Sequence, residues 1–213
     1  MMDKIVLIGD AASKTGMEKY MRNQFPFVGV PKPERVNQTK SYIKQSKIVP
    51  VDELIETINE LYYRREREYK YLAIDLIQAN YQRFTFENMV VIAQYFQEKP
   101  WWETVDTLRV PFGKYMLLHP EITAKIFNIF SGNDDFWMRR VAITMQLSFK
   151  EKTDTKILTE MILPDRATDE FFIQKAIGWA LRDYSKINPD WVRKFIEKNE
   201  LSKLAVREGS KYL

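Results

Sequence analysis

The chain has 213 residues, of which 45% are hydrophobic and 29% charged, so we expect a folded protein with enough chain to bury a sizeable core. It has no cysteine and a single histidine, His119, which excludes disulfides, iron–sulfur clusters, thiolate zinc sites and His-rich metal motifs. The formal net charge of +4 permits binding to nucleic acid without requiring it.

In chain order, the first apolar run is residues 5–8, which lie in the one stretch with strand-like alternation. This run is too short for the core of a signal peptide or for a membrane span, so we expect a cytoplasmic protein without membrane attachment. From Met17 onward apolar residues recur at helical spacing, as in 54–62, 72–77 and 90–94. The residues that we expect to separate the helices are Pro31, Pro33, Pro50, Pro100, Pro111, Pro120, 132–134, Pro164 and Pro189.

The helical segments repeat loosely. Ala73, Ala142 and Ala176 each lie inside an apolar stripe and are 69 and 34 positions apart, which indicates a period of about 35 residues with two helices in each repeat. Stacked helical pairs of this length predict an all-α fold, a right-handed solenoid of HEAT-like repeats with a concave face, formed as one domain over residues 1–213. Such arrays often serve as protein scaffolds, so the fold alone does not select a ligand.

The segment 101–106, Trp-Trp-Glu-Thr-Val-Asp, is the most informative one. Trp102 and Asp106 are spaced i and i+4, so they share one face of a helix, whereas Trp101, Val105 and Leu108 point toward the core. The alternative is that Trp102 is also in the core and that Asp106 caps a turn, and the pattern alone does not decide between the two.

Two further segments carry cations beside tryptophan. The first is 137–143. Adjacent residues of a helix diverge by about 100°, so only one of Arg139 and Arg140 can face a groove squarely. The alternative is that both lie over Trp137.

The mixed run of charges at 64–68 is typical of a solvated face.

In 170–184 the mid-helix Gly178 suggests close helix packing or close approach of a ligand. Trp179, next to it, could belong to the core. Arg182 could simply pair with Asp183 or Glu170.

Segments 101–106, 137–143 and 170–184, together with 20–35, occur in the order and at the spacing of one family. In them the chain resembles the AlkD-type DNA alkylation repair family of DNA glycosylases over roughly residues 17–205. The resemblance implies a HEAT-like solenoid that clasps double-stranded DNA containing alkylated bases and releases cationic N3- and N7-alkylated purines. It implies no cofactor and no metal, and a clasp of this kind can act as a monomer, which is the state we expect.

By resemblance, Asp106 matches the catalytic carboxylate of the family. Trp102 and Trp179 match two indoles that flank the deoxyribose of the damaged nucleotide. Arg140 matches an arginine that contacts the DNA backbone, and Tyr20 an aromatic residue near the same cleft. The family is thought to act without flipping the base into a pocket.

Cations should supply the affinity for DNA through contacts with phosphates, and Lys150, Lys175 and Arg182 are candidates beside Arg140. Ser148 stands where the family leads us to expect a lysine. That departure keeps a second hypothesis open, a relative that binds DNA without excising a base, and the fold class alone keeps a third, a protein-interaction scaffold.

The chemistry suits these residue types. An alkylated purine that carries a positive charge leaves as a neutral base, so the developing charge sits on an oxocarbenium-like sugar, as in glycoside hydrolysis. A carboxylate stabilises that charge and can orient a water molecule. Indole faces add cation–π attraction, so the reaction needs no metal.

Overall fold

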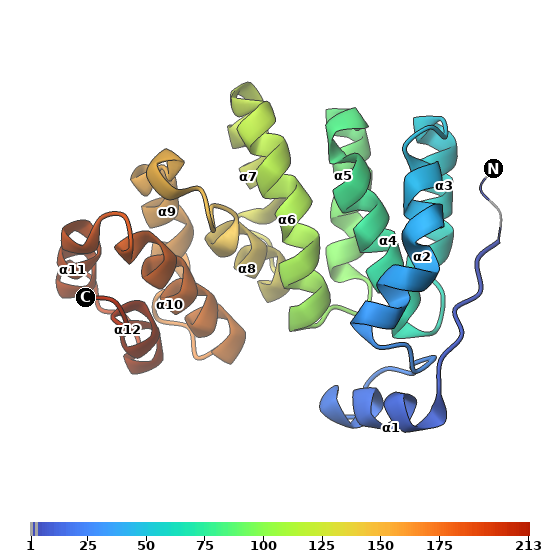
Figure 1. Ribbon diagram of the computed structural model, residues 1–213. Helices are drawn as coiled ribbons and strands as arrows, with labels where there is room; N and C mark the ends of the chain where they lie inside the picture. Colours follow the sequence, from blue (N-terminus) through green and yellow to red (C-terminus); the bar gives the residue numbers. More distant parts are fainter. Residues whose placement is uncertain (1, 3) are drawn as a thin grey trace. The chain divides into compact units, whose positions relative to one another are not determined.

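The computed structural model describes residues 2 and 4–213, and the described part contains α-helices, short 3-10 helices and no strand (Figure 1). The α-helices are α1 (Ala11–Tyr20), α2 (Lys32–Ser46), α3 (Val51–Tyr62), α4 (Arg67–Asn80), α5 (Phe86–Ala93), α6 (Trp102–Leu118), α7 (Thr123–Phe130), α8 (Phe136–Thr144), α9 (Thr155–Ile162), α10 (Phe171–Ser185), α11 (Pro189–Lys198) and α12 (Lys203–Gly209). The all-α prediction is therefore confirmed. The 3-10 helices are η1 (Tyr81–Arg83), η2 (Gln94–Gln97), η3 (Pro120–Ile122), η4 (Lys150–Lys152) and η5 (Leu163–Asp165).

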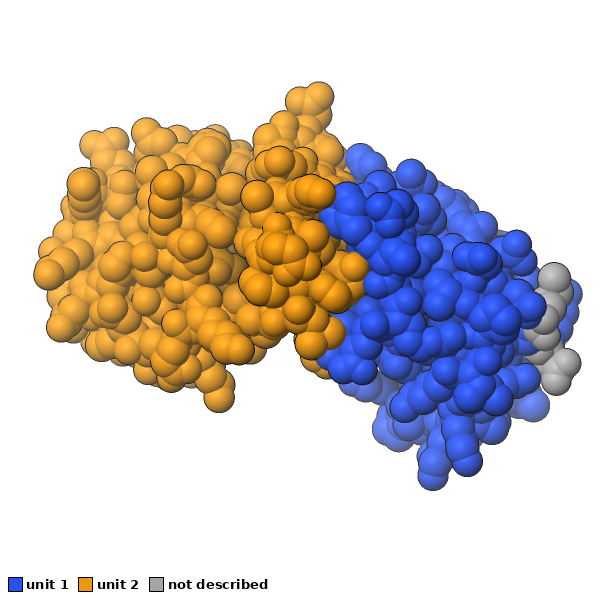
Figure 2. All heavy atoms as spheres, turned by 90° about the horizontal axis from the view of Figure 1, so that it is seen from above, with its two compact units in different colours: residues 1–98 blue, residues 99–213 orange. Residues whose placement is uncertain are grey.

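The chain divides into two compact units, residues 1–98 and 99–213, which Figure 2 colours separately. The single domain over 1–213 stays a prediction. Across the described residues no helix combines the length and the apolar character that crossing a bilayer requires.

In the unit of residues 1–98, α4 packs against both α2 and α3. The apolar stripes expected at 54–62 and 72–77 face this contact, with Leu54, Ile58, Leu72 and Leu76 fully buried. Periodicity thus located the core of this unit, because a helix with one apolar stripe must bury that stripe against a neighbour.

The charge run at 64–68 is not the solvated face that its composition indicated. Arg67 and Glu68 are buried, and the Glu68 carboxylate accepts the backbone N–H groups of 28–30 at 2.8 to 3.0 Å. The guanidinium of Arg67 lies 3.8 Å from the ring centre of Phe25. The Glu68 carboxylate can be buried because it satisfies the polar backbone of the loop between α1 and α2.

In the unit of residues 99–213, α10 is the central helix and packs against α8, α11 and α12. Ile173, Ile177 and Leu181 form its buried face. Ala142 of α8 and Ala176 of α10 are buried in the same unit, as the repeat pattern required. In Figure 1, α10 and α12 lie side by side at the C-terminal end of the chain.

Pro111 does not separate two helices, contrary to the prediction, but lies inside α6. A proline in a helix interior costs about 3 kcal/mol. The helix continues because Pro111 itself is buried together with Leu108, Phe112 and Tyr115, and burial of large apolar side chains contributes roughly 1.5–3 kcal/mol each.

Candidate functional site

The start of α6 is fixed by a cluster of aromatic rings. Trp101, the N-cap residue, packs against Trp137 of α8 and Phe172 of α10, with ring centres 6.1 and 5.3 Å apart. Trp137 and Phe172 are themselves 4.8 Å apart. The three rings come from the N-cap of α6, from α8 and from α10, so the cluster joins the helices that carry the predicted site residues Asp106, Arg140 and Trp179.

Asp106, one turn into α6, forms a bidentate ion pair with Arg140 of α8. The Nε–H of Arg140 donates to Oδ1 at 2.9 Å, and Nη2 donates to Oδ2 at 2.8 Å. Nη1 of Arg140 donates to the backbone carbonyl of Phe172 at the start of α10. The Asp106 side chain is 17% exposed and that of Arg140 5%. This paired-fork geometry fixes the carboxylate in one orientation, and the carboxylate stays partly exposed.

The two adjacent arginines of α8 diverge, as helical geometry predicted. Arg139 donates from Nε to both carboxylate oxygens of Asp165 at 3.1 Å and from Nη1 to the carbonyls of Asn133 and Asp134. Arg139 therefore joins the loop before α8 to η5, whereas Arg140 reaches Asp106. The alternative in which both lie over Trp137 is wrong.

Arg109 is a second cation near Asp106 that the sequence analysis did not identify. It lies three residues after Asp106 on α6, is 7% exposed, and reaches the carbonyl of Met145 with Nη1 at 3.5 Å. Its Nε finds no hydrogen-bond acceptor among the residues that the structure describes. Burial lowers the pKa of Arg109 to about 10, while the nearby carboxylates of Asp106 and Asp183 act in the opposite direction. The i, i+3 spacing from Asp106 was the available signal.

On α10, Lys175, Trp179 and Arg182 are spaced i, i+4 and i+7 and are all partly exposed, so they share one face of the helix. Lys175 and Arg182 both pair with Glu208 of α12, at 3.2 and 3.0 Å. The suggested pairing of Arg182 with Asp183 or Glu170 is replaced by this contact across helices. No feature of the sequence around Glu208 pointed to it.

Gly178 has the packing role that its mid-helix position suggested. A Cβ atom at this position would lie 2.4 Å from Cβ of Glu208 and 3.1 Å from the carbonyl oxygen of Ala205. Glycine therefore lets α12 approach α10 closely enough for Glu208 to reach Lys175 and Arg182.

The remaining residues predicted to bind DNA are Tyr20 and Lys150. Tyr20 is the last residue of α1, in the unit of residues 1–98, and is 70% exposed. Lys150 is exposed and begins η4, with φ of +55°. Ser148, where a lysine was expected, has φ of +69° and donates its backbone N–H to Asp183 at 2.7 Å. The DNA-binding roles of Tyr20 and Lys150 stay predictions.

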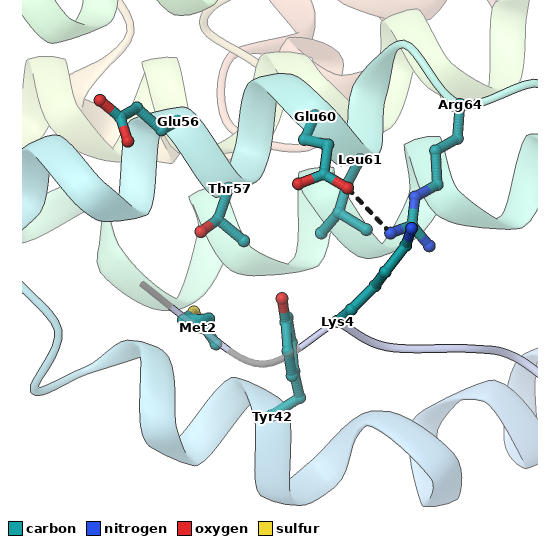
Figure 3. Close-up of a pocket in the computed structure, with 8 residues that line it drawn as sticks. All are labelled: Met2, Lys4, Tyr42, Glu56, Thr57, Glu60, Leu61 and Arg64. Atoms are coloured by element: carbon teal, nitrogen blue, oxygen red, sulfur yellow. Dashed lines mark hydrogen bonds and ion pairs between the residues drawn. The ribbon is translucent and has the colours of Figure 1, made fainter.

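Two cavities in the described residues have linings that do not include Asp106. One of about 460 Å³ lies between the N-terminal segment, α2 and α3, and Figure 3 shows Glu60 and Arg64 paired on its wall. Another of about 570 Å³ lies among α6, α7 and the segment before α9. Neither lining includes Asp106, Trp102 or Trp179. Within the described part of the chain, no three His, Asp or Glu side chains gather in a way that could hold a metal ion.

Comparisons with known proteins agree with one another. A family model described as "DNA alkylation repair enzyme" matches residues 1–213. A solved structure described as a predicted DNA alkylation repair enzyme from Enterococcus faecalis is 45% identical, with a TM-score of 0.96 and 99% of both chains covered.

Two Streptococcus mutans structures share the fold at lower identity. They are AlkD2, at 15% identity with a TM-score of 0.68, and smu.31 of strain UA159, at 16% with a TM-score of 0.65. Each comparison covers 94% of this chain and 99% of the other. A search of curated proteins found no match.

Proposed function

The chain belongs to the family of DNA alkylation repair enzymes, and on that premise we propose that it is a DNA glycosylase. Its substrate is duplex DNA that carries a cationic N3- or N7-alkylated purine, and its reaction is hydrolysis of the N-glycosidic bond. Asp106, Trp102 and Trp179 are the residues that we propose to act on the sugar.

The observation that carries this proposal is the bidentate pair of Asp106 and Arg140. An ionised carboxylate has two oxygens with about four lone-pair positions, and Arg140 occupies one position on each oxygen. The carboxylate therefore keeps acceptor capacity for a water molecule while its orientation is fixed. A fixed negative charge at the surface suits a charged sugar that develops in a substrate too large to enter the protein.

The leaving group explains why so few residues suffice. A cationic purine departs as a neutral base, so no acid is needed to protonate it, and the positive charge moves to the sugar. Asp106 stabilises that charge and orients the attacking water; the C–N bond breaks, the C–O bond forms, and the water's proton passes to solvent. Trp102 and Trp179 offer indole faces to the same charge, worth about 2 kcal/mol or more when water is excluded.

Arg140 has a more constrained role than a simple phosphate contact. Three of its five N–H groups are used by Asp106 and Phe172, and the side chain is buried. We propose that its first task is to orient Asp106. The contact with the DNA backbone that the resemblance implies would use the remaining Nη hydrogens.

The test is the substitution Asp106→Asn in an excision assay on methylated duplex DNA. We expect release of 7-methylguanine to fall about 100-fold or more, since the charge opposite the sugar is lost, while duplex binding stays nearly unchanged. Asp190→Asn is the matched control, because Asp190 is an exposed aspartate of α11 in the same unit. Full activity in the Asp106 variant would refute the mechanism.

Ser148 supports the second candidate, a relative that binds DNA without excising a base. Its backbone N–H is bound by Asp183, and its short side chain cannot replace a lysine at a phosphate. Salt-sensitive duplex binding by the wild-type protein without excision above the spontaneous rate would establish this candidate. Absence of both binding and excision would favour the interaction scaffold instead.

A further inference from the structure

Glu208 of α12 is surrounded by four cations. Lys175 and Lys211 contact its carboxylate at 3.2 and 2.7 Å, and Arg182 and Arg207 at 3.0 and 3.8 Å. The Glu208 side chain is only 9% exposed, whereas those of the cations range from 27% to 72%. We call these four cations and Glu208 the Glu208 cluster. Its cations come from two helices, α10 and α12, and from the turn that follows α12.

The charges of the cluster do not balance. Every described ion pair of the four cations ends on the same carboxylate, so one negative charge faces four positive charges. The attraction lowers the pKa of Glu208 to about 2, chiefly through hydrogen bonds from Lys211 and Lys175. A contact whose only purpose was to join α10 to α12 would need one or two cations, and the surplus positive charge costs self-repulsion.

The cluster is organised rather than a chance gathering of lysines. Gly178 permits the approach of α12 that brings Glu208 between Lys175 and Arg182. The buried carboxylate then limits the conformations of four long side chains, which reduces the entropy lost when they bind a ligand. Lys175 and Arg182 also flank Trp179 on one face of α10, by helical spacing.

We propose that the Glu208 cluster binds phosphodiester groups of the duplex DNA backbone beside the nucleotide that Trp179 contacts. The inference rests on the proposed function and adds two residues to it, Arg207 and Lys211, which nothing in the sequence had marked. Glu208 is a positioning residue in this site, because it acts on DNA only through the cations that it holds.

The test is the salt dependence of binding to an unmodified duplex, measured by fluorescence anisotropy for the Arg207→Gln/Lys211→Gln variant. Each lost phosphate contact should reduce the slope of log K against log salt by about 0.9. Loss of two contacts weakens binding at low salt. The ratio of the wild-type to the variant binding constant then falls about tenfold between roughly 50 and 200 mM salt. The control is Arg193→Gln/Lys194→Gln on α11, which removes the same charge from exposed positions of the same unit.

The outcomes separate this inference from the proposed function. If the slope of log K against log salt changes only in the Arg207→Gln/Lys211→Gln variant, and circular dichroism shows both variants folded, the result supports DNA binding by the Glu208 cluster. Equal effects in the two variants, or none, would overturn it while leaving excision by the wild type untouched. Titration with inorganic phosphate is the last arm: micromolar binding that the variant loses, with an unchanged DNA slope, would overturn the proposal in favour of free phosphate.

Discussion

Gly178 shows how one missing methyl group can position two helices. Replacing a mid-helix glycine by alanine normally adds up to about 1 kcal/mol of stability. Here the new Cβ would lie 2.4 Å from Cβ of Glu208, an atom close to the backbone of α12 that cannot move alone. We expect Gly178→Ala to lower the free energy of unfolding by up to about 2 kcal/mol net, because overpacking costs about 1–3 kcal/mol and outweighs the gain in helix propensity.

The measurement is urea unfolding followed by tryptophan fluorescence. Gly16→Ala is the control, since Gly16 lies within α1 and a Cβ there meets nothing within 4 Å. That substitution should stabilise α1 by up to about 1 kcal/mol, as judged by circular dichroism. Stabilisation by both substitutions would show that α12 tolerates displacement from α10.

Single residues of the candidate site were predictable only as far as local spacing reaches. The sequence placed Trp102 and Asp106 on one face of a helix, and it marked Gly178 as a point of close packing. It could not pair Asp106 with Arg140, which is 34 positions away, or Arg182 with Glu208. Those partners depend on how helices cross, which periodicity along one helix does not determine.

The loop between α1 and α2 illustrates an element held by a buried charge. The Glu68 carboxylate, on α4, accepts three consecutive backbone N–H groups of this loop, and Gly29 there has φ of +98°. We expect Glu68→Ala to lower the free energy of unfolding by roughly 3–5 kcal/mol, since it leaves buried donors without an acceptor.

Chemical denaturation followed by circular dichroism checks this prediction. Glu60→Ala is the control, because Glu60 forms an exposed i, i+4 pair with Arg64 whose loss should cost less than about 1 kcal/mol. A similar small loss for both variants would mean that water replaces Glu68 at the loop.

At the scale of elements, the sequence predicted helices well where an apolar stripe was long and failed where tertiary contacts overrode a local rule. The stripes at 54–62 and 72–77 became α3 and α4. Pro111 was predicted to end a helix, but α6 continues through Pro111 because the neighbouring residues are buried. The stretch 4–8 forms no strand; Leu7 donates instead to the hydroxyl of Tyr69. In both stretches burial or a tertiary contact outweighed the local sequence rule.

At the scale of the whole molecule, the free energy of unfolding depends on pH through every carboxylate whose pKa differs between the folded and unfolded states. The pKa of Glu208 is held at about 2, below its ordinary value of 4.5, by Lys211 and Lys175 first of all. Asp75 acts in the opposite sense, because burial raises its pKa despite the nearby Arg35. A carboxylate with a lowered pKa stabilises the fold above its unfolded pKa, and this stabilisation is lost as the pH falls toward the folded value.

We therefore expect Glu208→Gln to be less stable than the wild type at pH 7. The difference should shrink steadily from about pH 4.5 and vanish near pH 2, where the wild-type carboxylate is itself protonated. All five tryptophans lie in residues 99–213, so tryptophan fluorescence follows unfolding of the unit that contains Glu208. Glu197→Gln, an exposed glutamate of α11, is the matched control and should show no such dependence. A difference between Glu208→Gln and the wild type that stayed constant from pH 7 to pH 2.5 would refute the attribution of this stability to the charge of Glu208.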